Sequence, residues 1–130
     1  MGSFECRADQ NKNRLYIALA GFFRGRDVDP AMEELAAALA TLRPQFDVVT
    51  DLSEFVPGAP GAAEALRRGG EMVKARGRRN AVRITGGLMT GLMQFQRLLR
   101  GVFDEDSVRF AKSTAAADSI LDNWPADRDG

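Results

Sequence analysis

Three polar side chains that could carry chemistry, Asp51, Ser53 and Glu54, directly follow the apolar stretch 46–50. Ligands often bind where a parallel strand ends, so a strand over 46–50 would place these side chains at a binding edge. Asp51 and Glu54 could act there as a carboxylate pair. Alternatively, Asp51 orders the loop by accepting hydrogen bonds from backbone N–H groups, and we favour this second interpretation.

The segment 56–61, Val-Pro-Gly-Ala-Pro-Gly, is the part of the chain richest in turn-forming residues. It follows the polar run and precedes a predicted helix, so we expect it at the same edge of the sheet. Loops on a rigid frame often carry binding residues. The partner-binding residues that we expect in this region are Asp51, Ser53, Glu54, Pro57, Gly58, Pro60 and Gly61.

Met89 and Met93 lie in a predicted helix over residues 88–100 that is apolar on more than one stripe. A helix that packs on one side needs an apolar arc of about 100°. The two methionines fall toward the margin of that arc, and methionine-rich surfaces suit adaptable protein contacts. Either the helix is deeply buried, or these methionines contact a partner, which could be a second copy of the chain. We include both in the partner-binding set.

The chain lacks several residue types on which common catalytic, metal-binding and phosphate-binding sites depend. The chain has no histidine, the commonest general base and metal ligand. Cys6 is the only cysteine, which leaves no internal disulfide and a poor ligand set for zinc. Because Glu5 is next to it, we expect Cys6 to be buried or inert. The glycine turn at 84–91 lacks the lysine of a P-loop. We therefore expect no metal, no cofactor and no catalytic residue.

Charge is unevenly distributed, although the chain has 18 basic and 18 acidic residues and is neutral overall. Residues 63–101 hold nine basic and two acidic side chains. The basic cluster 74–79 would complement the dipole at a helix end. A charged protein-binding surface is a second explanation. Nucleic acid binding is disfavoured, because no aromatic residue lies between Arg67 and Arg83.

Strand-like and helix-like segments alternate along the 130 residues, which is typical of a single α/β domain. The polar tract 9–13 predicts the turn of an N-terminal hairpin, and later strand–helix–strand units predict parallel crossovers. Strands are expected over 3–9, 14–20, 46–50, 81–85 and 107–111, and helices over about 27–43, 61–76, 88–100 and 113–124. Ser113 is the expected N-cap of the last helix. The result is one mixed sheet packed by about four helices, with its core over 13–124 and a frayed tail from residue 125.

The order of these elements resembles the STAS domain, the fold of bacterial anti-sigma-factor antagonists. The resemblance covers residues 13–124 and rests on the hairpin, the first helix, the strand ending Val-Val-Thr-Asp-Leu-Ser at 48–53, and the closing strand and helix. In that family, a loop after this strand carries a phosphorylatable serine, whereas positions 59–62 here are Ala, Pro, Gly and Ala. The resemblance therefore implies a divergent branch without that switch. We expect no phosphate on Ser53, because we place it at the end of a strand.

The resemblance implies a non-catalytic regulatory or scaffolding domain that binds another protein. The alternative is a carrier of a lipid or another small apolar ligand, held between sheet and helices by Phe22, Phe23, Met72, Leu92 and Phe95. An enzyme is the least expected class, because no two of the remaining acid–base groups form a recognisable motif. The alanine- and arginine-rich composition indicates a bacterial source. We also expect a cytoplasmic protein with no signal peptide and no membrane span, for which a homodimer is an open alternative.

Overall fold

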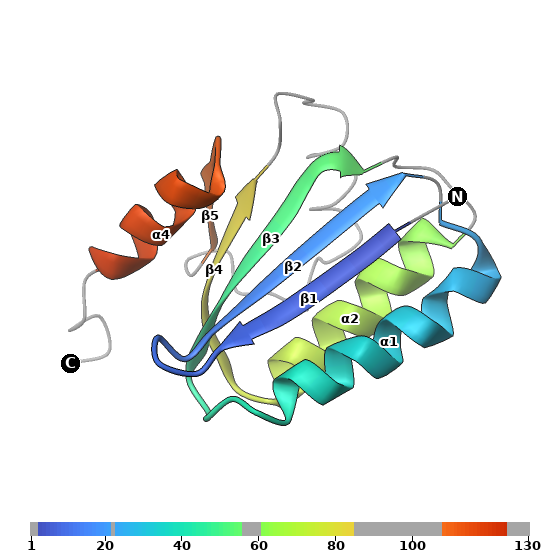
Figure 1. Ribbon diagram of the computed structural model, residues 1–130, viewed down its shortest axis with the longest axis horizontal. Helices are drawn as coiled ribbons and strands as arrows, with labels where there is room; N and C mark the ends of the chain where they lie inside the picture. The colour runs from blue at the N-terminus through green and yellow to red at the C-terminus, as the bar shows by residue number, and fades with distance from the viewer. Residues whose placement is uncertain (1–2, 22, 56–60, 85–107, 125–130) are drawn as a thin grey trace.

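A five-stranded mixed sheet forms the centre of the computed structural model, which describes residues 3–21, 23–55, 61–84 and 108–124 (Figure 1). In spatial order, the strands are β1 (Ser3–Asp9), β2 (Arg14–Gly21), β3 (Phe46–Phe55), β4 (Arg78–Ile84) and β5 (Val108–Ala111). β1 runs antiparallel to β2, whereas β2, β3, β4 and β5 are parallel to one another. The strands thus follow one another across the sheet in the same order as along the chain.

The N-terminal hairpin is held by a short polar turn between β1 and β2. The Asp9 carboxylate accepts a hydrogen bond from the Lys12 backbone N–H over 3.1 Å. Asn13 has a positive φ of 55°, a conformation that asparagine tolerates better than most residues. The Asn13 side chain donates to the Arg43 carbonyl oxygen and accepts from the Arg43 N–H, which joins the turn to the chain before β3. These bonds confirm the predicted turn.

Helices cover both faces of the sheet, but unequally. The helices among the described residues are α1 (Gly25–Leu39), α2 (Ala62–Ala75) and α4 (Thr114–Asp122). α1 connects β2 to β3, α2 connects β3 to β4, and the two lie side by side on one face (Figure 1). Right-handed crossovers between strands added in one direction fall on the same face, so this placement follows from the strand order. α4 comes after β5 and packs on the opposite face, against β3, β4 and β5.

Each face of the sheet has its own apolar core. Successive residues of a strand point to opposite faces, so neighbouring positions contribute to different cores. On β2, Leu15 and Ile17 pack toward α1 and α2, whereas Tyr16 packs toward α4. Trp124 is 7% exposed and closes the smaller core just after α4, where the sequence placed the end of the last helix.

Several element boundaries differ from those expected. α1 ends at Leu39 and not near residue 43, and β4 begins at Arg78 and not at Ala81. β3 continues to Phe55 instead of ending at Thr50, because a bulge lets the strand stay paired with β2. α1 begins at Gly25, earlier than expected. The Asp27 carboxylate accepts a hydrogen bond from the Arg24 backbone N–H over 2.8 Å, which satisfies a backbone donor at the start of the helix.

The α/β class, the antiparallel hairpin and the parallel strand order are confirmed. The Ser113 side chain accepts a hydrogen bond from the Ala116 N–H over 3.1 Å, which confirms the predicted N-cap of α4. The helix expected over 88–100 lies outside the described residues, so the expected number of about four helices stays a prediction.

Candidate functional site

Asp51 lies within β3 at a bulge, and its carboxylate orders the backbone of the strand. The Asp51 Oδ1 atom accepts hydrogen bonds from the Ser53 backbone N–H over 2.9 Å and from the Ser53 hydroxyl over 2.7 Å. Ala18 is opposite Asp51 but Ala20 is opposite Glu54, so β3 has one extra residue here. The favoured interpretation, that the Asp51 carboxylate accepts a hydrogen bond from a backbone N–H group, is confirmed. Its expected position was wrong, because the residue lies inside the strand and not in a loop beyond it.

The other two members of the polar run differ in exposure. Ser53 is half-buried, and its hydroxyl is the donor to Asp51. Glu54 is exposed, whereas Leu52 and Phe55 are buried in the core beneath α1 and α2. Asp51 is half-buried and bonded to Ser53, so Glu54 is the most exposed member of the run.

Gly61 marks a close approach between two segments that are distant in the sequence. It is buried at the start of α2, and its N–H donates to the Phe23 carbonyl oxygen over 2.8 Å. A Cβ atom at this position would overlap the Arg24 carbonyl oxygen. Gly61 therefore holds the start of α2 against the connection between β2 and α1, and this buried position argues against its predicted role as a direct partner contact.

The remaining residues of the predicted partner-binding set fall outside the described part of the chain; they are Pro57, Gly58, Pro60, Met89 and Met93. Of the set, the structure brings Asp51, Ser53 and Glu54 together on β3. It separates their roles, since two of them order the strand and one is exposed.

A small apolar hollow lies between the sheet and the helices α1 and α2. Its volume is about 40 Å³, which holds about one water molecule. Phe23 is 1% exposed and belongs to the adjoining core, and Met72 packs at the margin of that core. Phe22, Leu92 and Phe95, the other residues predicted to line a carrier pocket, lie outside the described residues. Among the described residues this space is too small for a lipid, and a carrier function stays a prediction.

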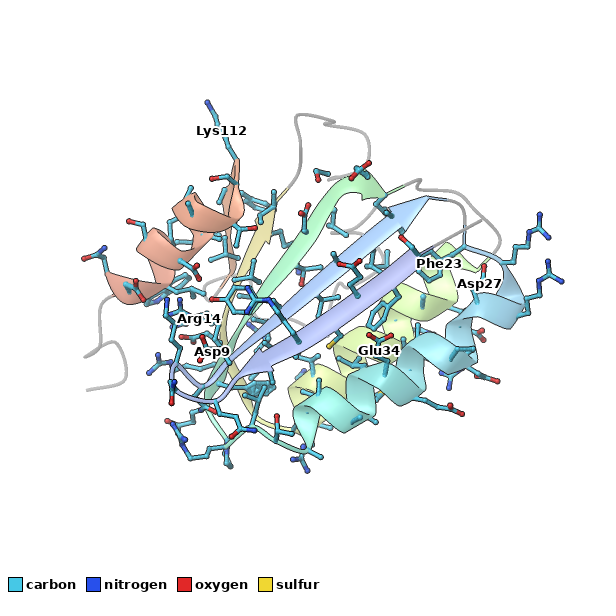
Figure 2. All side chains as sticks on the ribbon, viewed as in Figure 1. Asp9, Arg14, Phe23, Asp27, Glu34 and Lys112 are labelled. Carbon is cyan, nitrogen blue, oxygen red and sulfur yellow. The ribbon has the colours of Figure 1, made fainter. Side chains whose placement is uncertain are left out.

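A larger, open groove of about 410 Å³ lies beside α4, over the first three strands. We call it the β1–β3 groove. On the α4 side of the sheet, its lining residues are Glu5, Arg7, Tyr16, Ala18, Val49, Asp51 and Thr114. Cys6 and Glu34 also line it, although Cys6 packs toward the α1 side, so the hollow extends round the edge strand β1. Figure 2 shows Glu34 on α1, beside β1.

Sequence reasoning did not single out Glu5, Arg7 or Tyr16. A signal was present, because polar and apolar residues alternate in β1 and give that strand one solvated face. The sequence could not show that α4 packs over β3, β4 and β5 and leaves much of this face open.

A charged network fixes α4 beside the groove. Arg14 is 4% exposed and donates to Asp118 over 2.8 Å and to Asp122 over 3.0 Å. The Tyr16 hydroxyl donates to the same Asp118 oxygen over 2.6 Å. Burial alone would raise the pKa of Asp118, but the hydrogen bonds from Tyr16 and Arg14 outweigh burial and lower that pKa. The Arg7 guanidinium lies 3.9 Å from the centroid of the Tyr16 ring, so the groove wall contacts the same network.

The Cys6 thiol is half-buried, and its pKa is raised. Burial, with a further contribution from the Glu34 carboxylate, raises its pKa to about 12. The thiolate is the nucleophile, so this sulfur is almost entirely in its inert, protonated form at neutral pH. The raised pKa agrees with the expectation of an inert thiol, and the side chain is half-buried.

Many of the basic residues of α2, its C-cap and β4 have partners within the chain. These pairs are Arg67–Glu71, Arg68–Asp29, Arg79–Asp47, and Arg76 with the Leu39 carbonyl oxygen. A neighbouring carboxylate cancels much of the electric field of a paired arginine. These arginines therefore attract a polyanion less than the nine basic and two acidic residues of 63–101 indicated.

Comparison of the chain with protein-family models and with curated proteins finds no match. None of the helices in the described ranges is long and apolar enough to cross a membrane. A functional assignment must therefore come from the fold and from the β1–β3 groove.

Proposed function

We propose that this chain is a non-catalytic, STAS-like regulatory or scaffolding domain that binds another protein through the β1–β3 groove. The observation that carries the proposal is the groove itself, an open surface of about 410 Å³ on one face of the sheet. The order of the elements, with an opening hairpin followed by strands and helices in alternation, supports the STAS-like part of the proposal.

The chemistry of the groove favours a protein over a polyanion or a lipid. Glu5, Glu34 and Asp51 contribute negative charge to the groove and Arg7 contributes positive charge. The Arg7 guanidinium covers the ring of Tyr16. Neighbouring charges of both signs give a surface that can match a partner with the opposite pattern. A polyanion would instead be attracted by a surface of one sign, and an apolar ligand by an apolar lining.

The frame beneath the groove is rigid, which suits recognition. Two hydrogen bonds from Ser53 to Asp51 fix the bulge in β3, and Arg14 anchors α4 at the side of the groove. A surface built on strands and an anchored helix loses little conformational entropy when a partner binds.

The proposal is tested by placing a bulky charge in the groove. Ala18 lines it from β2, so Ala18→Arg would fill it without removing an existing polar contact. Ala37 is exposed on α1, and Ala37→Arg is a matched control for size and charge. Each tagged variant is used for affinity capture from the native host, followed by quantitative mass spectrometry, after circular dichroism has shown that it folds.

We expect a protein that is captured equally by the wild type and Ala37→Arg and is reduced at least about tenfold with Ala18→Arg, because a buried clash or unpaired charge costs more than 1.4 kcal/mol. Equal capture by all three would reject the groove as the binding surface. Native mass spectrometry of the gently purified wild type gives an independent check, since a bound lipid would favour the carrier alternative.

A further inference from the structure

The outer side of β1 is an open strand edge among the described residues. β1 is the first strand of the sheet, and its described neighbour is β2 on the other side. Its seven residues pair with β2 in an unbroken register from Ser3 to Asp9, without a bulge. The strand also contains no proline and no glycine. Bulges, prolines and charged side chains are devices by which native proteins protect an exposed edge, and β1 has only the charges. This straight edge can therefore pair with another strand where that strand's charges match its own.

The side chains of β1 are complementary to β1 itself. In an antiparallel pair, the two strands run in opposite directions and residues directly opposite each other share a face. If Cys6 is opposite Cys6 of a second copy, Glu5 of each copy is opposite Arg7 of the other. Both residues are exposed on β1, so both copies have these charges available. This register therefore forms two pairs of opposite charge.

The two registers shifted by two residues do not have this property. A pair centred on Glu5 would place Glu5 opposite Glu5, and a pair centred on Arg7 would place Arg7 opposite Arg7. Like charges directly opposite each other destabilise a strand pair. The Cys6-centred register is thus favoured over its neighbours by the charges of two residues.

The other face of β1 adds apolar contact in the same register. Phe4, Cys6 and Ala8 are partly buried against the core beneath α1 and α2. With Cys6 at the axis, Phe4 of each copy is opposite Ala8 of the other, a large side chain against a small one. Pairing would remove more of the surface of these side chains from water.

We propose that β1 pairs with β1 of a second copy, antiparallel and centred on Cys6, to form a two-fold symmetric dimer with one continuous sheet. Two-fold dimers use the same patch on both copies, as this edge does. The dimer goes beyond the proposed partner binding and does not depend on it. Glu34, on α1, lies near Cys6 of β1. In the dimer, the Glu34 carboxylates of the two copies would both lie near the two-fold axis. The attraction within the Glu5–Arg7 pairs must outweigh the repulsion between these two carboxylates.

Sedimentation equilibrium of the full chain at low ionic strength tests the dimer, because salt screens exposed charge pairs. The variants are Glu5→Arg, Arg7→Glu and the double variant that carries both changes. Glu64 is exposed on α2, so Glu64→Arg is a control with the same change in net charge. Thermal unfolding of each variant shows whether it folds.

We expect the wild type and Glu64→Arg to dimerise alike, and each single β1 variant to weaken the dimer at least about tenfold. The double variant should restore wild-type affinity to within about threefold, because it exchanges the two charges without changing their complementarity. Arg7→Glu also loses the contact with Tyr16, so Glu5→Arg is the cleaner single change. A wild type that stays monomeric at about 100 µM, or a dimer that Glu5→Arg leaves unchanged, overturns the proposal.

Cross-linking tests the register. In a Cys6→Ser background, Ser3→Cys and Asp9→Cys are made in separate chains, since Ser3 would be opposite Asp9 of the second copy. Mild oxidation of the mixture should give a disulfide-linked heterodimer, and either chain alone should give little. Cross-linking of one chain with itself, or none in a sample that is dimeric by sedimentation, would reject the Cys6-centred register.

Discussion

At the scale of single residues, Gly61 shows how a glycine can be required by a distant segment. Its position leaves no room for a Cβ, because the Arg24 carbonyl oxygen occupies that space. Its N–H also donates a hydrogen bond to the Phe23 carbonyl oxygen. The residue was expected to contact a partner, since the composition of 56–61 indicates a loop and cannot indicate what the loop touches.

Gly61→Ala should lower the free energy of unfolding by about 2 kcal/mol, because overpacking of a tight site forces the backbone to shift. Urea denaturation followed by circular dichroism measures this. Gly25→Ala is the control, since no atom lies within 4 Å of a Cβ at that position, and its effect should stay within about 0.5 kcal/mol. Equal effects of the two substitutions would show that the close approach is not what requires glycine.

At the scale of elements, the contact between α1 and α2 has a position that can be improved. Gly69 lies inside α2, where glycine costs roughly 1 kcal/mol relative to alanine. A Cβ there would lie 3.6 Å from Leu35 Cδ2 and 3.7 Å from Met32 Cε, which are ordinary van der Waals distances. The site can therefore accept a methyl group without a clash.

Gly69→Ala should raise the free energy of unfolding by about 0.5–1 kcal/mol, through the smaller entropy of the unfolded chain and added contact in the small apolar hollow. Gly77→Ala is the contrasting variant, because Gly77 has a φ of +97° that L-residues rarely adopt. It should destabilise by about 1 kcal/mol. The prediction for Gly69 is contradicted if chemical denaturation shows a loss of stability.

The elements were largely predictable because their signals are local, whereas the groove is not. The turn after β1 and the Ser113 cap of α4 were each indicated by neighbouring residues. The bulge in β3 was missed, because it depends on pairing with β2. The hydrogen bond from the Ser53 N–H to Asp51 is local, and the role of Asp51 as an acceptor for backbone N–H groups was predicted. The surface around it depends on how far α4 reaches, which no stretch of sequence specifies.

At the scale of the whole molecule, the network around Arg14 joins the first hairpin to the last helix. Arg14 is buried on β2, and its partners Asp118 and Asp122 lie on α4, more than a hundred residues later. Removing a partner of a buried charge is costly, because the charge then lacks compensation.

Asp118→Asn should lower the free energy of unfolding near pH 7 by about 1–3 kcal/mol, since it weakens the bonds from both Arg14 and Tyr16. Asp122→Asn is the matched control. The Asp122 side chain is 55% exposed, so its loss should cost less than about 1 kcal/mol. Denaturant unfolding of both variants measures the difference, and a larger effect at Asp122 would contradict the assignment.

The pH dependence of this variant has a definite sign. The pKa of Asp118 is lowered in the folded state, so its contribution is fully present above the ordinary aspartate pKa of about 4 and is lost as the pH falls through the folded-state value. The stability difference between wild type and Asp118→Asn should therefore shrink as the pH falls from about 5 to about 2. A difference that stays constant over this range would mean that the pKa of Asp118 is not lowered on folding.

The sequential strand order also bears on how the chain acquires its structure during synthesis. Each strand from β2 onward is placed next to the one made just before it, so the sheet can grow from the N-terminal hairpin as residues leave the ribosome. α4 is made after the five strands that the structure describes. Until it emerges, Arg14 and Tyr16 remain without the aspartates that they bind in the finished protein. The nascent sheet would thus expose the surface of its smaller core, and the last helix would complete the fold.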